Sequence, residues 1–365
     1  MNILAYFRDG GTPTELEAKY GIVHRWHPTY PNLLLLKYDM IDSPMGEDIV
    51  QECRGLILDT ADDFKPVAWP FGKFFNHGEG HADEIDWRTA RVQEKLDGSL
   101  CTIWWYDNQW HVSTTGSPDA GGQVGDFPFT FKELFWRTFE ECGYAVPPED
   151  FRDFSFMFEL TTKYNRVVVV HDHPRVTLLA VRNRVTGQEM DPETFLKMYG
   201  VVGTFPLNSF ENIIDTFRTL DPLHTEGYVV VDASFRRVKV KHPGYVSLHH
   251  LKEGATSKNF LNIIRSGERT EFLTYFPEWS EEFLAIQAKY DELVAHLETE
   301  YEEIKHIESQ KDFALLATKT RCPGALFQVR KGYVKTIKDY LAGITIDSLS
   351  VMVGIKEAKP KKASE

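Results

Sequence analysis

The sequence has few cysteines, no long apolar run and no excess of positive charge. Its four cysteines are widely spaced and form no Cys-x-x-Cys pair, which argues against a zinc site or a disulfide framework and favours a reducing compartment. The longest aliphatic run, residues 33–36, is far too short to span a membrane. The first ten residues lack a cationic start followed by an apolar stretch, so we expect no signal peptide and a cytoplasmic protein.

The net charge of −13 excludes a surface that is basic throughout, although a local basic groove remains compatible with it. The chain has no Gly-x-Ser-x-Gly elbow, and its glycine-rich segment 119–126 lacks the Gly-Lys-Ser/Thr ending of a phosphate-binding loop. Among the thirteen histidines, His77 and His81 have the i, i+4 separation of a metal-binding helix, but the two glycines between them make a helix improbable and the HExxH order is absent. His249 and His250 are adjacent and therefore do not face one site in regular structure. We interpret these histidines as ordinary residues.

The chain is long enough for two domains, and its apolar and charged fractions are those of a globular protein. Up to about residue 252, strand patterns outnumber helical ones, which favours an α+β fold over a doubly wound sheet. We predict strands at 33–38, 101–106, 109–113, 154–160, 167–170, 176–181, 226–231 and 236–241, with helices within 1–20 and at 131–142.

After residue 252 the pattern becomes helical. Apolar residues between Phe283 and Ile304 recur at intervals of three and four, as expected for a long amphipathic helix with an acidic outer face. Further helices are predicted within 315–340, with a break at 322–324, and at 344–353. We therefore expect a body at 1–252, a helical C-terminal domain at 253–355 and a basic, flexible tail at 356–365.

One segment, Glu94–Leu100, combines a lysine with an Asp-Gly turn. Asp97-Gly98 between apolar residues is typical of a hairpin corner, and taken alone the segment favours that interpretation. The alternative is that Lys95 is a nucleophile, which requires an unprotonated amine and groups nearby that stabilise it.

Later segments supply charged residues of the kind that such a lysine would need. Glu159 interrupts an apolar strand, where an unpaired carboxylate would be costly. Glu226 opens the strand 226–231, and Lys239 and Lys241, two apart on the returning strand, point to one face. The hairpin thus brings Glu226 and the two lysines together.

Taken in order, these segments resemble the motifs of the covalent nucleotidyltransferases, beginning with Lys95-Leu96-Asp97-Gly98. The resemblance is closest to the T-even bacteriophage RNA ligase 1 family, through ECRG at 52–55, KFFN at 73–76, FEL at 158–160 with NRVV at 165–168, EGYV at 226–229 and KVKHPGYVSLH at 239–249. It covers roughly residues 38–252 and implies an antiparallel-sheet nucleotidyltransferase domain followed by an all-helical domain.

The resemblance implies an ATP-dependent RNA ligase that joins a 5′-phosphate to a 3′-hydroxyl through a lysine–AMP intermediate and an adenylated RNA end, with magnesium or manganese as cofactor and RNA repair as its role. The catalytic residues would be Lys95, Asp97, Lys239 and Lys241. The nucleotide would be bound by Tyr38, Arg54, Lys73, Phe75, Gly98, Glu159, Lys239, Lys241 and Tyr245. Glu159 and Glu226 would hold the metal.

The implied substrates are single-stranded RNA or nicked tRNA-like ends. A separate end-healing kinase/phosphatase would prepare them, since no P-loop kinase motif is present. We expect a monomer without a membrane partner, in the host cytoplasm if the chain is virus-encoded. One departure stands out: the family often has a lysine in the turn after the second strand, where this chain has residues 114–117, TTGS.

Three alternatives stay open at this point. The same lysine could serve a DNA ligase or a capping-type guanylyltransferase, although those enzymes usually continue into an OB-fold rather than helices. The chain could be a nonenzymatic RNA-binding protein on a ligase-like body. The acidic helical domain could also select substrates or bind another protein, and RNA would then have to contact a face other than the acidic one.

Overall fold

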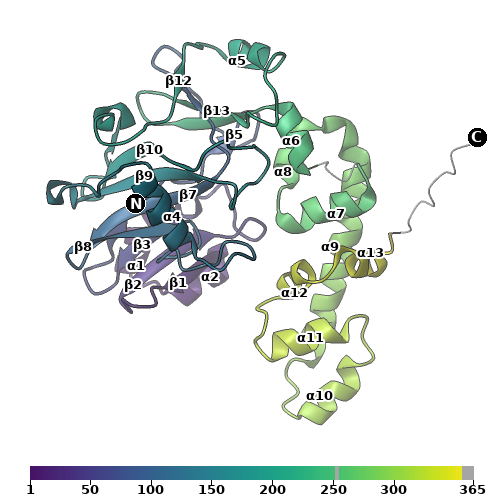
Figure 1. Ribbon diagram of the computed structural model, residues 1–365. Helices are drawn as coiled ribbons and strands as arrows, with labels where there is room; N and C mark the ends of the chain where they lie inside the picture. Colours follow the sequence, from purple (N-terminus) through teal and green to yellow (C-terminus); the bar gives the residue numbers. More distant parts are fainter. Residues whose placement is uncertain (251–254, 356–365) are drawn as a thin grey trace, which may run out of the picture. The chain divides into compact units, whose positions relative to one another are not determined.

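A computed structural model describes residues 1–250 and 255–355 of the chain. The chain divides into two compact units, Met1–His249 and His250–Glu365, each with its own apolar core. The first unit contains three β-sheets, and the described part of the second contains helices without strands (Figure 1). The predicted α+β class is therefore confirmed. The expected boundary at residue 252 and the tail 356–365 lie outside the described residues.

The first sheet is an antiparallel meander whose two faces are both apolar. Three helices accompany it, and side chains of α1, α2 and α3 share one core with Leu34, Leu36, Leu56 and Leu58 of the sheet. On the other face, Leu33, Leu35 and Ile57 pack with Trp104 of the second sheet. The elements are α1 (Asn2–Arg8), α2 (Pro13–Tyr20), β1 (Ile22–Trp26), β2 (Leu33–Tyr38), α3 (Asp48–Glu52), β3 (Arg54–Asp59) and β4 (Lys65–Ala68).

The second sheet has the order β11-β10-β9-β7-β8 and is antiparallel throughout. Helix α4 begins with a capping box formed by Thr130 and Glu133, and its apolar side packs on the sheet. The elements are β7 (Ser99–Tyr106), β8 (Gln109–Thr114), α4 (Phe131–Glu141), β9 (Phe154–Thr161), β10 (Arg175–Asn183) and β11 (Glu189–Met190), with 3-10 turns at Glu149–Phe151 and Pro192–Phe195.

The third sheet has the order β12-β6-β13-β14-β5, and only its β14–β5 pair is parallel. Valines at 92, 230, 238 and 240 form its core with residues that include Ile213 of α5. The elements are β5 (Phe75–Asn76), β6 (Arg91–Glu94), β12 (Thr204–Phe205), α5 (Phe210–Thr216), β13 (Gly227–Val231), β14 (Arg237–Lys241) and the following α6 (Pro243–His250).

The segment Lys95–Gly98 is not a hairpin corner. The strand before it, β6, pairs with β12 and β13 in the third sheet, whereas the strand after it, β7, pairs with β8 and β9 in the second. The hairpin interpretation is therefore wrong, because local turn chemistry cannot reveal that the two flanking strands find different partners. Lys95 lies on the crossing between two sheets.

The strand predicted at 167–170 is also wrong, since these residues pair with no neighbouring strand. The backbone N–H groups of Val168 and Val169 instead donate to Oδ2 of Asp97, at 2.8 and 2.7 Å. A carboxylate from a distant segment thus takes the donors that a sheet ladder would have used.

The described part of the second unit is a bundle of short helices around the long helix α9. The predicted long amphipathic helix is confirmed, and six of its seven apolar positions are buried, with Tyr301 half-buried. The elements are α7 (Ser257–Ser266), α8 (Arg269–Tyr275), a 3-10 turn (Pro277–Trp279), α9 (Ser280–Ile304), α10 (Gln310–Ala317), α11 (Pro323–Arg330), α12 (Ile337–Gly343) and α13 (Ile346–Val353).

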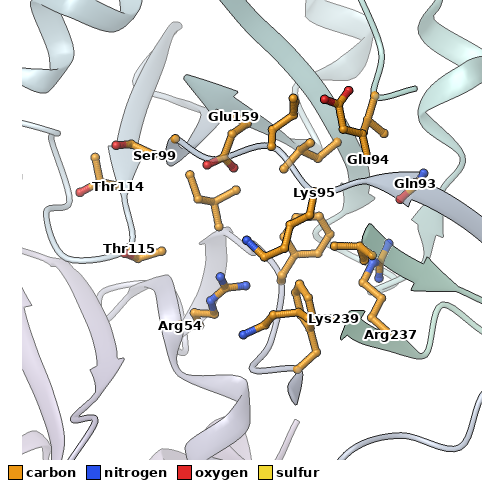
Figure 2. Close-up of a pocket in the computed structure, with 18 of the residues that line it drawn as sticks. Arg54, Gln93, Glu94, Lys95, Ser99, Thr114, Thr115, Glu159, Arg237 and Lys239 are labelled. Carbon is orange, nitrogen blue, oxygen red and sulfur yellow. The ribbon is translucent and has the colours of Figure 1, made fainter. Parts of the chain in front are cut away.

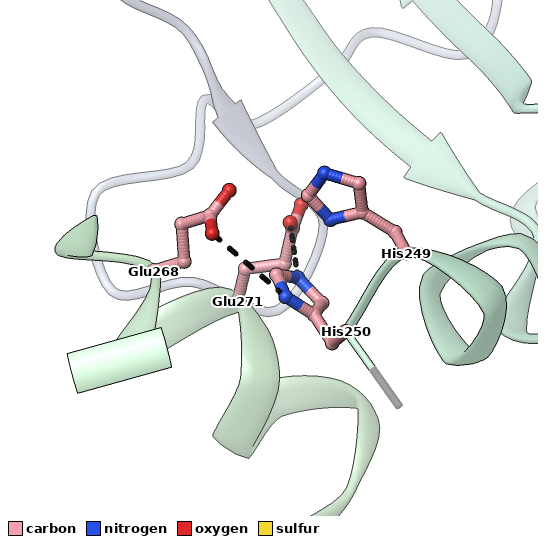
Figure 3. A group of neighbouring side chains, drawn as sticks. All are labelled: His249, His250, Glu268 and Glu271. Atoms are coloured by element: carbon pink, nitrogen blue, oxygen red, sulfur yellow. Dashed lines mark hydrogen bonds and ion pairs between the residues drawn. The ribbon is translucent and has the colours of Figure 1, made fainter. Parts of the chain in front are cut away.

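A buried histidine pairs with two acidic residues near the start of this unit. Nε2 of His250 lies 2.9 Å from a carboxylate oxygen of Glu271, and Nδ1 lies 3.9 Å from one of Glu268 (Figure 3). His250 is thus a paired core residue.

Among the helices that the structure describes, none is long and apolar enough to cross a membrane.

Candidate active site

A cavity of about 480 Å³ lies where the three sheets meet. Arg54 comes to it from the first sheet, Glu159 from the second and Lys239 from the third, and Lys95 enters from the crossing between sheets. Figure 2 shows the nitrogen atoms of Lys95, Arg54 and Lys239 directed into one space, with the Glu159 carboxylate facing them. Residues that the sequence separates by up to 187 positions therefore surround one volume, as Arg54 and Lys241 illustrate.

Lys95 is held beside Glu226 by both its backbone and its side chain. Its N–H donates to the carbonyl oxygen of Gly227 at 2.9 Å, and its Nζ lies 2.6 Å from Oε1 of Glu226. The lysine side chain keeps 20% of its surface exposed, whereas that of Glu226 keeps 4%. The amine can therefore reach a ligand in the cavity, whereas the carboxylate is buried beside it and lies outside the cavity lining.

Two glycines allow the backbones around this pair to approach closely. A Cβ added at Gly98 would lie 2.3 Å from the carbonyl oxygen of Leu160, and one at Gly227 would lie 2.2 Å from that of Val240. Gly227 also has φ of +137°, which favours glycine. Gly98, after Asp97, and Gly227, after Glu226, are thus positions where only glycine fits without a steric clash.

Several cations converge on the same cavity. Lys241 Nζ lies 3.8 Å from Oε1 of Glu226. Burial lowers the pKa of Lys239 well below its usual range, and the charges of Lys73, Arg54, Lys241 and Lys95 lower it further. A cluster of cations with so little counter-charge is unfavourable alone and favours an anionic ligand such as phosphate.

Arg54 has an unsatisfied donor within this cluster. Its Nη1 is buried, and no hydrogen-bond acceptor reaches it from the residues that the structure describes. Its guanidinium lies 5.2 Å from the ring of Phe74, which holds it over an aromatic face. A buried donor without an acceptor is rare in proteins, and here a phosphate oxygen in the cavity would satisfy it.

The acidic side of the cavity fits a divalent metal. Burial raises the pKa of Glu159 to about 8, an effect that the attraction of Lys95 opposes and the nearby charge of Glu226 reinforces. Two carboxylates close enough to repel one another are a suitable oxygen donor set for Mg²⁺, which is typically held by one or two carboxylates together with substrate phosphates. The residues present therefore fit the metal that the sequence analysis assigned to Glu159 and Glu226.

Asp97 has partners that the sequence did not indicate. Besides accepting from Val168 and Val169, its carboxylate accepts from the hydroxyl of Tyr245, at 2.9 Å to Oδ1, and its carbonyl oxygen lies 2.7 Å from Nε2 of His171. Asp97 thus ties the Lys95 segment to a loop and to α6. Tyr245 is 3% exposed and contributes to the site through this bond, outside the cavity lining.

Three further predicted nucleotide ligands form a group of their own. The Nζ atom of Lys73 lies 5.2 Å from the ring of Tyr38 and 5.4 Å from the ring of Phe75, and both rings are buried. Neither the lysine nor the rings line the cavity around Lys95. The charge of Lys73 nonetheless acts on Lys239, so this group adjoins the cationic side of the site.

The sequence analysis missed several residues of the cavity lining. Gln93 and Glu94 directly precede Lys95, and burial raises the pKa of the Glu94 carboxyl. Phe74 sits between the noted Lys73 and Phe75, and Arg237 lies two residues before Lys239 on the same face of β14. The alternation of a strand could have identified Arg237. Thr115, where the family often has lysine, also lines the cavity.

In comparisons with known proteins, this chain is similar to several that are named as RNA ligases. The RNA ligase of Rhodothermus phage RM378 is 26% identical over 355 residues, which cover 79% of this chain and 78% of that protein. A putative bifunctional polynucleotide kinase/RNA ligase of Autographa californica nuclear polyhedrosis virus is 30% identical over 269 residues, covering 68% of this chain and 38% of that protein. Among solved structures, an archaeal ATP-dependent RNA ligase (form 2) aligns with 94% of this chain and 83% of its own, at 15% identity and a TM-score of 0.49.

The sequence model of a family described as "RNA ligase" matches residues 52–245. This range is more than half of the chain and includes every cavity-lining residue named above. This chain therefore belongs to the RNA ligases of the T-even bacteriophage RNA ligase 1 family.

Proposed function

We propose that this RNA ligase uses ATP and joins RNA ends through a covalent intermediate on Lys95. The observation that carries the proposal is the convergence of Lys95, Arg54, Lys239 and Lys241 on one cavity beside Glu226. A nucleophilic amine surrounded by cations and open to a nucleotide-sized space suits attack on a phosphate ester.

In the first step, Nζ of Lys95 attacks the α-phosphorus of ATP. An N–P bond forms, the bond between the α-phosphorus and the bridging oxygen breaks, and pyrophosphate leaves. The amine must lose a proton, and Oε1 of Glu226, 2.6 Å from Nζ, is placed to accept it. Arg54, Lys239 and Lys241 stabilise the negative charge that develops on the phosphoryl oxygens.

A divalent metal held by Glu159 and Glu226 would neutralise further charge on the phosphates. Asp97 keeps the Lys95 segment in place through Val168, Val169 and Tyr245.

In the second step, an oxygen of the RNA 5′-phosphate attacks the AMP phosphorus, and the N–P bond to Lys95 breaks as the amine regains a proton. In the third, the 3′-oxygen of the other end attacks the 5′-phosphorus. A phosphodiester forms, the hydroxyl proton is lost and AMP leaves. RNA with a 5′-phosphate and a 3′-hydroxyl is therefore the substrate, and other enzymes would supply such ends from damaged RNA.

The helical second unit argues against the alternatives that share the lysine. DNA ligases and capping guanylyltransferases usually continue into a five-stranded barrel, whereas the described residues after Lys241 form helices. A purely RNA-binding role does not account for Lys95 and the two lysines of β14 lining one cavity, with Glu226 paired to Lys95 and close to Lys241.

The test is incubation with ATP or GTP labelled at the α-phosphate, with magnesium. We expect ATP to label the wild type, the Lys95→Ala variant to stay unlabelled, and the label to pass to 5′-phosphorylated RNA. Lys19→Ala is the matched control, since Lys19 is an exposed lysine at the end of α2. Labelling from GTP alone, or labelling of Lys95→Ala, would contradict the proposal.

A further inference from the structure

A group of aromatic side chains lies at the surface of the second sheet. The rings of Phe127 and Phe129 stack at 5.5 Å with an angle of 10°, and the ring of Tyr164 meets them edge-on at 4.9 and 5.2 Å. We call Phe127, Phe129 and Tyr164 the aromatic platform. Its members come from the loop before α4 and from the loop after β9.

Phe127 is the member whose position core packing does not explain. Phe129 and Tyr164 are half-buried and pack against the core of the second sheet, but Phe127 is outside that core and keeps 40% of its surface exposed. An exposed phenylalanine alone is common. One stacked on a second ring and bordered by cations is the arrangement that proteins use to hold unpaired bases.

Two cations border the platform. The guanidinium of Arg137 lies 5.0 Å from the ring of Phe129 and 5.7 Å from that of Tyr164, and Nζ of Lys163 lies 5.1 Å from Tyr164. Both cationic side chains are exposed. Within residues 1–250 and 255–355, no carboxylate forms an ion pair with either of them. Their charge is therefore available to an anionic ligand.

Through Tyr164, the platform adjoins the first of two neighbouring cavities, and the second of these is lined by Lys95. A cavity of about 410 Å³ is lined by Arg137, Lys163 and Tyr164 and also by His171 and Asp172. A second, of about 470 Å³, shares His171 and Asp172 and extends to Arg175, Lys95 and Glu226. Arg137, Lys163 and Arg175 thus line two neighbouring cavities that share His171 and Asp172. Of the carboxylates in their linings, those of Glu141 and Asp172 are exposed, and the others, on Glu94, Asp97 and Glu226, lie near Lys95.

We propose that the aromatic platform and these two cavities bind a single-stranded segment of the RNA substrate. A base stacks on Phe127, and phosphates contact Arg137, Lys163 and Arg175. The requirement for single strands follows from the exposed ring, because bases in a duplex have their faces covered by their neighbours. This assignment rests on the proposed ligase function and gives that function a substrate-binding surface.

The test measures binding of a fluorescent, 5′-phosphorylated 12-nucleotide single-stranded RNA without ATP or metal, so that no chemistry occurs. Phe127→Ala should weaken binding roughly 10-fold, since stacking on an aromatic ring contributes this order of affinity per base. Lys163→Ala should reduce the slope of log Kd against log salt concentration by about 0.7, the value for one phosphate contact on a single strand. A duplex of equal length should bind the wild type more weakly.

The chain offers matched controls for both variants. Lys19 lies 4.8 Å from the ring of Tyr20, the same kind of contact as Lys163 with Tyr164, and Trp26 in β1 is 48% exposed. Lys19→Ala and Trp26→Ala should leave affinity and salt dependence unchanged. Phe127→Trp should retain binding because it keeps the stacking surface.

Self-adenylation with labelled ATP separates this proposal from the ligase function. Phe127→Ala and Lys163→Ala should adenylate like the wild type, which also shows that they fold, and should then transfer AMP poorly to RNA at limiting concentration. Unchanged RNA affinity and salt slope in both variants would overturn the proposal, as would loss of adenylation in both. Failure of the wild type to adenylate would instead overturn the ligase function.

Discussion

The two units of the molecule bury different kinds of side chain. In the first, Asp97, Glu226, Arg237 and several other charged residues are buried. In the described part of the second, the buried polar residues are His250, Asn259 and Ser350, and every Asp, Glu, Lys and Arg keeps part of its surface in water. The second unit thus has the core of an ordinary helical bundle, and the first does not.

The difference indicates where the chemistry takes place. Burying a charge is unfavourable unless a partner compensates for it, so buried charges that persist commonly serve a purpose other than stability. In the first unit, the acidic and basic groups are only partly matched: Nη1 of Arg54 has no acceptor among the described residues, and Lys239 is surrounded by other cations. A bound nucleotide would complete this arrangement, whereas the described part of the second unit has no fully buried Asp, Glu, Lys or Arg that would call for a charged ligand.

The largest stability effect is expected in the apolar unit. Leu341 is fully buried in α12, and Leu341→Ala should lower the free energy of unfolding of the second unit by about 2–5 kcal/mol through lost burial and a cavity. Hydrogen exchange of its helices would measure this, with labelling by ATP as the control. If Leu341→Ala also lost adenylation, the catalytic residues of the first unit would depend on the second unit, and the distinction drawn between the two units would be wrong.

In the first unit, removing a buried charge should affect rate more than stability. Lys239→Ala should slow self-adenylation by about 10²–10³-fold, as expected when one group that stabilises transition-state charge is lost. The thermal midpoint should not fall, because the variant no longer has to bury this cation among others. Single-turnover labelling and a thermal melt measure the two quantities, and a destabilised variant with a normal rate would reverse the argument.

A smaller effect is expected at the hydrogen bond between Tyr245 and Asp97. Tyr245→Phe removes a donor to a buried carboxylate and should cost about 1.5–3 kcal/mol. Tyr199→Phe is the matched control, since that hydroxyl donates to the neutral carbonyl oxygen of Ala145 at 3.0 Å and should cost about 0.5–1.5 kcal/mol. Denaturant unfolding measures the loss in free energy of unfolding for each variant. Equal losses would show that a hydrogen bond to the Asp97 carboxylate is no stronger than one to a neutral carbonyl oxygen.

A further effect is a pH dependence of stability. Burial raises the pKa of Glu159 from 4.5 to about 8, so between these values the folded chain keeps a proton that the unfolded chain releases. The free energy of unfolding should therefore fall as pH rises through this window and level off above it. Glu159→Gln removes this contribution, so its stability relative to the wild type should increase between pH 5 and 8. Parallel slopes for both proteins would contradict the raised pKa.

Most regular elements could be predicted from sequence because local periodicity determines them. The strands around Leu33–Tyr38, Phe154–Leu160 and Glu226–Val231 and the long helix near Phe283–Ile304 are all present with small shifts at their ends. The hairpin of β13 and β14 was also sufficient to predict that Glu226 and Lys241 lie close together, because adjacent antiparallel strands bring specific residues face to face.

The failures occurred where distant segments meet. Residues 167–170 have a strand composition, but Asp97, some 70 residues earlier, takes two of their N–H donors. Asp97-Gly98 has the composition of a hairpin turn, yet its flanking strands join different sheets. Gln93 and Glu94 were assigned no role in the sequence motifs, because their position in the cavity lining depends on how the sheets converge. Local patterns contain none of this information.

The close approach of backbones at Gly98 and Gly227 bears on how related genes are classified. Any side chain at either position would overlap a carbonyl oxygen of a neighbouring strand, so the strands could not come together around Lys95 and Glu226. A related gene that keeps the lysine and the glutamate but has lost one of these glycines should therefore be classed as a decayed copy. The presence of both glycines is thus a simple criterion for distinguishing active homologues from inactive ones.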